Sequence, residues 1–305
     1  MATNALSVSN VKQRLVMSMF EGANQNRALS EAAWMDTFDW RYDQDRKQID
    51  AAAMTGIPSF SSWTEGNNIS PSGITSLDTK SLTYVALAAS VVFGPFTPSE
   101  IPNYKALVMR KLGFSTISTI YEAAAAAKAD AFTENTGNHE VHGDKALFAT
   151  DHEMSGGTRG NKIVSAVFDR PTYLVGRNGM MTWNNYQGQV FDLTAAGLSI
   201  EYHVNNDEAV KQAILSRVTS DQQQYNVANE DNVVFVRNPY FEEEDDVIMQ
   251  TRIEGEKAFL GWERLPPTMY VGRDTANVNE VVTVVMGYAF GNKGTPDGVF
   301  GVSAS

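Results

Sequence analysis

Histidine and carboxylate side chains that could bind a metal ion or exchange protons are concentrated in one short part of the sequence. Of the four histidines, His139, His142 and His152 lie close together, and Asp151 and Glu153 flank the third. Imidazole and carboxylate groups are ligands of zinc and other divalent metals, so this group could serve a metal-dependent hydrolase. No helix or strand is predicted to fix the spacing of these residues. The sequence therefore favours a polar, structural loop and keeps the hydrolase as an alternative.

Two other segments carry residues with chemical potential. The run FEEEDD at residues 241–246 has five carboxylates, which attract calcium. It lacks the glycine spacing of an EF-hand loop, and this favours a solvated turn. The run SGGTRGNK at residues 155–162 lacks the Gly-Lys-Ser/Thr sequence of a phosphate-binding loop, and this favours a surface loop. With no HExxH, GxSxG or strand-linked GxGxxG motif, we assign no catalytic residue, cofactor-binding residue or metal ligand.

Composition narrows the function classes. The formal net charge is −12, from 24 basic and 36 acidic residues, and such a chain repels nucleic-acid phosphates. The absence of cysteine excludes disulfides, thiolate nucleophiles and cysteine-ligated metals. The first fifteen residues are polar, and the longest apolar run, at residues 84–94, is too short to span a bilayer. We expect a soluble protein that is made in the cytoplasm.

The elements that must position these side chains follow a clear order. Residues 1–50 predict short aromatic-rich helices, the second with Trp34, Phe38 and Trp40, and residues 51–83 predict a long loop or extended hairpin. A buried strand over 84–94 and a long helix over about 103–133 follow, with Gly113 as a candidate kink. The alanine run at 123–127 permits close contact with another backbone, although it also fits simple helix propensity.

The second half of the sequence mixes helices with strands. We expect a helix over 171–183, strand and turns over 188–200, and an N-capped amphipathic helix over 205–218 with acids in its first turn. The remainder is mostly β, and the run EVVTVVM at 280–286 predicts a strand buried on both faces. The pattern is that of an α+β protein.

One passage, AFTENTGNHEVHGDKALFATDHEMSGGTRGNK at 131–162, resembles the major capsid proteins of tailed phages, closest to the Mu-type major head subunits. In those proteins a long helix ends in a turn with phenylalanine and threonine, and a Gly-x-x-x-Leu-Phe-x-Thr-x-His segment and a glycine- or asparagine-rich loop follow. The matching residues here are Gly143, Leu147, Phe148, Thr150 and His152. The resemblance is good over about 105–165, moderate in outline beyond, and weak in the first 80 residues.

This resemblance implies the HK97-like capsid fold with a definite division of the chain. The expected parts are an N-terminal arm (1–45), an extended loop or E-loop (46–83), a peripheral domain (84–159) with a spine helix at about 103–133, an axial domain (160–257), strands that return through the peripheral domain (258–290), and a C-terminal axial segment (291–305).

The implied function is structural, not enzymatic: a shell subunit that self-assembles into pentamers and hexamers of an icosahedral phage head around double-stranded DNA. The implied partners are further copies of the chain, a separate scaffolding protein, a portal and a possible decoration protein, with no membrane. The implied location is the virion, assembled in the cytoplasm of a host bacterium. Some capsids crosslink lysine to asparagine, but nothing selects Lys80 and Asn292 for that reaction. An encapsulin-like cellular compartment shell remains the alternative with the same fold.

Overall fold

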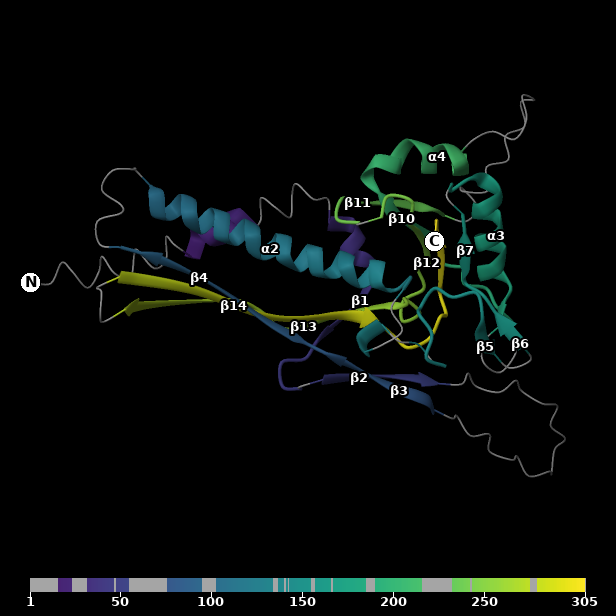
Figure 1. Cartoon of the computed structure of the whole chain (residues 1–305), viewed down its shortest axis with the longest axis horizontal. Coiled ribbons are helices and arrows are strands. Elements are labelled where there is room, and N and C mark those ends of the chain that lie inside the picture. The colour runs from purple at the N-terminus through teal and green to yellow at the C-terminus, as the bar shows by residue number, and fades with distance from the viewer. Residues whose placement is uncertain are drawn as a thin grey trace, which may run out of the picture.

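The computed structural model describes most of the chain and shows a mixed helix and strand fold with an elongated part and a compact part (Figure 1). The described residues are 16–23, 32–46, 48–54, 76–94, 103–133, 137–139, 141, 143–154, 157–165, 167–184, 190–215, 232–241, 243–274 and 279–304.

The elongated part consists of one long helix, α2 (Tyr104–Asp130), that lies along a four-stranded sheet (Figure 1). Long β13 (Phe259–Asp274) and β14 (Asn279–Asn292) form its centre, with β1 (Phe38–Tyr42) and β4 (Val85–Phe93) at the edges. β1 pairs in parallel with β13, and the other pairs are antiparallel. From Met109 onward, every turn of the helix buries one face, with residues such as Ile117 and Tyr121, against the sheet and the N-terminal segment.

The long helix predicted over about 103–133 is confirmed as α2, and its glycine has a packing role. α2 is uninterrupted through Gly113. A second helix, over residues 16–23, crosses α2 at this glycine. The approach is so close that a Cβ on Gly113 would lie 2.0 Å from the carbonyl oxygen of Met19. A Cβ on Gly22 would likewise lie 2.0 Å from the oxygen of Arg110. The two backbones approach closely because both contact residues lack a side chain.

The compact part contains a five-stranded sheet with two helices packed on it. The strand order is β11 (Val234–Asn238), β10 (Leu198–His203), β12 (Val247–Thr251), β15 (Val299–Ser303) and β7 (Lys162–Val164). Helices α3 (Arg170–Met181) and α4 (Asp207–Leu215) cover apolar side chains of this sheet and form a core separate from that of α2. Asp169 caps α3 by accepting a hydrogen bond of 2.9 Å from the Thr172 amide.

Short elements complete the description. The 3-10 helices are η1 (Ala32–Thr37), η2 (Gly137–His139) and η3 (Val204–Asn206), and the paired short strands are β5 (His152–Met154) with β6 (Gly157–Arg159) and β8 (Trp183–Asn184) with β9 (Val190–Phe191).

The predicted extended loop begins and ends as a two-stranded antiparallel hairpin of β2 (Gln48–Met54) and β3 (Ser76–Thr83), which extends below the four-stranded sheet in Figure 1. Residues 55–75, which connect the two strands, lie outside the described residues. Leu82 is buried with Trp262 and Ala289 of the long sheet, so the base of the hairpin is attached to the elongated part.

Three sequence-based expectations are wrong in detail. Phe38 and Trp40 lie in strand β1, not in a helix, because β1 pairs with distant β13 and Trp40 covers the bare backbone of Gly261. β4 is an exposed edge strand and not a buried one, with Val85 59% and Val92 57% exposed. Over residues 281–285, buried and half-buried residues alternate along β14. The strand is therefore fully buried on one face there and not on both.

Candidate functional site

His152, the centre of the predicted histidine cluster, is a buried structural residue. Its side chain is 0% exposed, and Nε2 lies 3.1 Å from both the Leu147 carbonyl oxygen and Asn161 Oδ1. Because both partners accept, the ring proton is on Nε2. Burial lowers the pKa of His152, so the ring is neutral at pH 7. Asn161 is also 0% exposed, so the surface-loop interpretation of residues 155–162 is wrong at this residue, whereas Gly157 and Thr158 are exposed as expected.

Asn161 forms hydrogen bonds to several residues around His152. Its amide nitrogen donates to the Leu147 carbonyl oxygen at 2.9 Å, and its Oδ1 accepts from the Ala149 amide at 3.0 Å. Nearby Arg159 donates to the Gly179 and Thr182 carbonyl oxygens at 3.0 and 2.6 Å, at the C-terminus of α3. A cation is favourable at this helix end. The loop therefore connects the two parts of the fold through hydrogen bonds.

The remaining histidines and acids do not complete a metal site within the described residues. His139 Nε2 lies 3.5 Å from Asp130 on α2, and Asp151 pairs with Lys145 at 2.5 Å. No group of three or more His, Cys, Asp or Glu side chains in the described ranges is placed to hold a metal ion. His142 is outside those ranges.

The acidic run at 241–246 is only partly a solvated turn. Glu243, Glu244 and Asp245 are exposed, whereas Asp246 is 4% exposed, and burial raises the pKa of its carboxyl group. Glu242 is not among the described residues. This arrangement gives the run a structural role at the start of β12, which the sequence pattern does not indicate.

A buried polar cluster that sequence reasoning missed joins the elongated part to the compact part. Lys128 of α2 is 0% exposed and forms an ion pair with Glu201 of β10, which is 2% exposed. Lys128 Nζ also donates to Thr37 Oγ1 at 2.6 Å and to the Trp34 carbonyl oxygen at 3.3 Å. All three protons of the ammonium group therefore have acceptors.

The cluster extends into the next two strands of the sheet. Glu201 Oε1 accepts from Asn238 Nδ2 of β11 at 2.8 Å. Gln250 of β12 donates through Nε2 to the Thr37 carbonyl oxygen at 2.9 Å. The N-terminal segment, α2 and three sheet strands thus meet at one set of hydrogen bonds. The only sequence signal was a lysine inside an alanine-rich helix.

Aromatic rings surround the Lys128 amine. Its nitrogen lies 4.6, 5.2 and 5.6 Å from the ring centroids of Phe38, Trp34 and Phe259. Desolvation is the largest influence on this group and lowers the pKa of Lys128, while the charge of Glu201 opposes that shift. An amine in such surroundings loses its proton more readily than a surface lysine.

The surface of the elongated part offers a long edge and an apolar groove. The outer edge of β4 has no strand neighbour among the described residues. Between α2 and β4 lie two adjoining hollows of about 150 and 530 Å³, and Leu87 and Thr119 line both. We call these together the α2–β4 groove.

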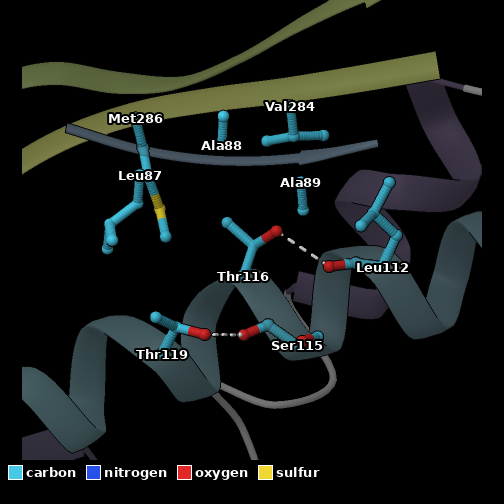
Figure 2. A pocket seen from close by; sticks show the side chains of 9 residues that line it. All are labelled: Leu87, Ala88, Ala89, Leu112, Ser115, Thr116, Thr119, Val284 and Met286. Carbon is cyan, nitrogen blue, oxygen red and sulfur yellow. Dashed lines mark hydrogen bonds between the residues drawn. The ribbon is translucent and has the colours of Figure 1, made fainter. Parts of the chain in front are cut away.

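Figure 2 shows the smaller hollow of the α2–β4 groove, with the side chains of Leu87, Val284 and Met286 facing the helix. Thr116 and Thr119 use their hydroxyl groups to donate to carbonyl oxygens one turn earlier in α2, at 2.8 and 2.9 Å. Because these hydroxyls are already bonded, the groove offers a mainly apolar lining to whatever covers it.

The Lys80–Asn292 pair remains unassigned. Asn292 is 4% exposed, accepts from the Gly294 amide through Oδ1, and donates through Nδ2 to the His139 carbonyl oxygen at 2.5 Å. The Lys80 side chain lies outside the described parts of the structure, although its backbone pairs with Ala51. Both ends of the Asn292 amide are therefore occupied by structural hydrogen bonds.

The arrangement of long helix, long strands, projecting hairpin and compact sheet is the HK97-like capsid fold, which confirms the fold class expected from the sequence. No family model matches the sequence, and no curated protein matches it significantly. Solved structures do resemble it. The mature capsid of bacteriophage PhiM1 matches with a TM-score of 0.57 at 14% identity, over 88% of this chain and 85% of that chain.

Two further structures support the same fold. The capsid of cyanophage P-SCSP1u matches with a TM-score of 0.55 at 14% identity, over 89% of this chain and 88% of that chain. A virus-like particle from Pyrococcus furiosus matches with a TM-score of 0.55 at 9% identity, over 95% of this chain and 98% of that chain. At these identities the matches show the fold. Among the described helices, none has the length and apolar character needed to cross a bilayer.

Proposed function

We propose that this chain is the major capsid protein of a tailed phage, which self-assembles into pentamers and hexamers of an icosahedral head around double-stranded DNA. The observation that carries the proposal is the match of almost the whole chain to capsid subunits of PhiM1 and P-SCSP1u. The Gly143–His152 pattern of the Mu-type head subunits supports placement in that group.

Within this proposal, the parts of the chain take the expected roles. Residues 1–45 are the arm, 46–83 the E-loop, 84–159 and 258–290 the peripheral domain, and 160–257 with 291–305 the axial domain. Two observations support this division: the β2–β3 hairpin lies at the base of the proposed E-loop, and β15, in the proposed C-terminal segment, pairs with β12 of the five-stranded sheet.

The proposed contacts between subunits use surfaces that the described part of a lone chain leaves uncovered. The edge of β4 offers backbone hydrogen-bonding groups, and exposed long edges are readily covered by another chain. The α2–β4 groove adds an apolar surface beside that edge. Adjacent copies in a shell would bury both.

The charge supports enclosure of DNA without adhesion. A subunit with a net charge of −12 repels phosphates at long range, so packaged DNA would remain free of the inner wall. In this proposal a separate scaffolding protein directs assembly in the bacterial cytoplasm, a portal occupies one vertex, and a decoration protein can bind outside.

The test is electron microscopy with light scattering on the purified full chain, alone and with a co-expressed candidate scaffolding protein. Rings of five or six subunits, or closed icosahedral particles, are expected. A chain that stays monomeric in every condition, including with the scaffold, would contradict the proposal.

A cellular compartment shell is the second candidate, and one observation favours it. The Pyrococcus furiosus virus-like particle matches over 98% of its own chain, although identity is only 9%. Particles purified from the native source discriminate the two: double-stranded DNA inside supports the phage head, and an enclosed enzyme supports the compartment. Among the described residues, no cluster of side chains favours the metal-dependent hydrolase.

A further inference from the structure

The junction between the elongated part and the compact part is largely apolar. One shared core contains Tyr121 and Ala124 of α2 together with Val236, Ile248 and Val299 of the five-stranded sheet and its flanks. The opposite face of that sheet carries the separate core of α3 and α4. Apolar contacts are not directional, so such a junction by itself determines how much surface is buried and not a single orientation.

A pair of opposite charges lies inside this junction. Lys128 of α2 is 0% exposed, and Glu201 of β10 is 2% exposed. The Lys128 ammonium group donates in a short contact to Glu201 Oε2, and the two groups belong to opposite sides of the junction. A charge-assisted hydrogen bond depends strongly on distance and angle, so this contact specifies a position in a way that the apolar contacts around it do not.

The other hydrogen bonds of the pair tie the same position to the N-terminal segment and to the neighbouring strands. Lys128 Nζ also donates to Thr37 Oγ1 at 2.6 Å, and Glu201 Oε1 accepts from Asn238 Nδ2 at 2.8 Å. Gln250 Nε2 donates to the Thr37 carbonyl oxygen at 2.9 Å. A slide of the compact sheet along α2 would separate Glu201 from Lys128 and Gln250 from Thr37 at the same time. Such a slide would leave charged and polar groups buried without partners.

The two charges are unfavourable to bury, so stability alone does not account for them. Desolvation is the largest influence on Lys128 and lowers its pKa. Uncharged side chains of similar volume often match or exceed the stability of a buried ion pair, whereas removal of one partner is strongly destabilising. The pair therefore adds little to the stability of the orientation in which it forms, and it strongly disfavours every orientation in which it is broken.

We propose that Lys128 and Glu201 are an orientation lock, which selects one relative position of the elongated and compact parts without stabilising the fold. The apolar core holds the two parts together, and the ion pair excludes the neighbouring arrangements that the core alone would permit. The lock belongs to the single chain, so it does not depend on the assembly of a shell.

A second lysine–glutamate pair provides a matched control. Lys105 of α2 and Glu280 of β14 are 2.5 Å apart, with side chains that are 29% and 22% exposed. Both residues lie in the elongated part, so their contact does not cross the junction. Neutralising this pair should leave the relative position of the two parts unchanged.

The test measures the distance between two spin labels on the full-length chain by pulsed electron paramagnetic resonance. The sequence has no cysteine, so Lys111→Cys on α2 and Ala209→Cys on α4 supply two exposed attachment sites, one on each part (Figure 1). The lock is removed by Lys128→Met with Glu201→Gln, which keeps the volume and leaves an oxygen to accept from Asn238. We expect one narrow distance in the labelled chain with the lock. Without the lock we expect a broad or split distribution, at an unchanged or higher melting temperature.

Every other outcome overturns the proposal. An equally narrow distribution without the lock would show that the apolar core fixes the orientation alone. A lower melting temperature, or failure to fold, would show that the pair stabilises the fold. Broadening in the control Lys105→Met with Glu280→Gln would show that the effect is not specific to the junction. Labels at Asn178→Cys and Ala209→Cys, both exposed in the compact part, should keep one distance without the lock, and broadening there would mean local loosening.

Discussion

At the scale of single residues, the chemically suggestive side chains of this chain are mainly parts of its interior. His152 and Asn161 are both fully buried and hydrogen-bonded to each other. A polar side chain at such a position fixes local geometry, since an unpaired buried group costs free energy. The resemblance identified His152 as part of a pattern, and the structure shows that Asn161 completes its hydrogen bonding.

Asn161→Ala should lower the free energy of unfolding by about 3 kcal/mol, because it removes the acceptor of the part-buried Ala149 amide and one of the two acceptors of the buried His152 ring. Denaturant unfolding of the purified chain measures this. The control Asn205→Ala removes an exposed hydrogen bond to Glu244 and should cost less than about 0.5 kcal/mol. Equal stability of the two variants would contradict the structural role of Asn161.

Asp297→Asn should change the pH dependence of stability. Burial raises the pKa of the Asp297 carboxyl group from 3.8 to about 6, against the opposing hydrogen bond from Trp183. Between these values the folded state holds a proton that the unfolded state has lost, so this group's contribution to stability falls as pH rises. The asparagine variant cannot ionise.

Relative to wild type, that variant should therefore gain stability from pH 4 to pH 7, on the order of 2 kcal/mol. Denaturation curves at several pH values measure the difference. A difference that stays constant with pH would show that the carboxyl group titrates at its ordinary value.

At the scale of elements, local patterns predicted what local interactions determine. The long helix, the helix that starts after Asp169 and the acidic start of α4 all appear close to their expected positions. β1 could not be predicted, because its strand character comes from parallel pairing of Phe38 with Phe259, far along the chain. The Lys128 cluster could not be predicted for the same reason: its members come from separate segments, and only the tertiary fold brings them together.

Gly113→Ala tests the crossing of α2 with the helix over 16–23. Alanine favours an isolated helix by about 1 kcal/mol, but here its Cβ would collide with the Met19 backbone. We expect faster hydrogen exchange over 16–23 and a lower melting temperature. Gly272→Ala is the matched control, because no atom lies within 4 Å of its added Cβ. Unchanged exchange in Gly113→Ala would rule out the close crossing.

Substitutions of two alanines in α2 test whether each side chain position matters for folding or for assembly. Ala125 is 1% exposed, so Ala125→Trp should overpack the core and prevent folding or lower stability by more than about 3 kcal/mol. Ala123 is exposed and lines the α2–β4 groove, so Ala123→Trp should fold normally and impair particle formation. Circular dichroism and electron microscopy read the two effects. Normal particles from Ala123→Trp would show that the groove stays uncovered in the shell.

At the scale of the whole molecule, the described residues form a packed body with several surfaces that no other described element covers. Two sheets and their helices form the body, and the edge of β4, the α2–β4 groove and the β2–β3 hairpin are available to neighbours. In the proposed shell these surfaces make the contacts between subunits, so assembly could be lost without loss of folding.

Deletion of residues 54–78, with the ends of the hairpin rejoined by a short turn, should leave a folded chain that cannot build a stable shell. Leu82 still anchors β3 to the long sheet, so the body should keep its melting temperature within a few degrees. Electron microscopy checks the particles. A Gly/Ser segment of equal length at 54–78 is the control for length alone, and normal particles from the deletion would refute the extended-loop assignment.

The strand order of the compact sheet has a consequence for the timing of synthesis. β15 lies between β12 and β7 and pairs with both, yet it follows the other four strands in the sequence. On the ribosome, β7 therefore emerges long before the neighbour that it needs, and β13 and β14 must be made first. The sheet can close only after the long strands exist, so a nascent chain cannot present a finished subunit surface early. Translation and shell growth would in this way be kept as successive events.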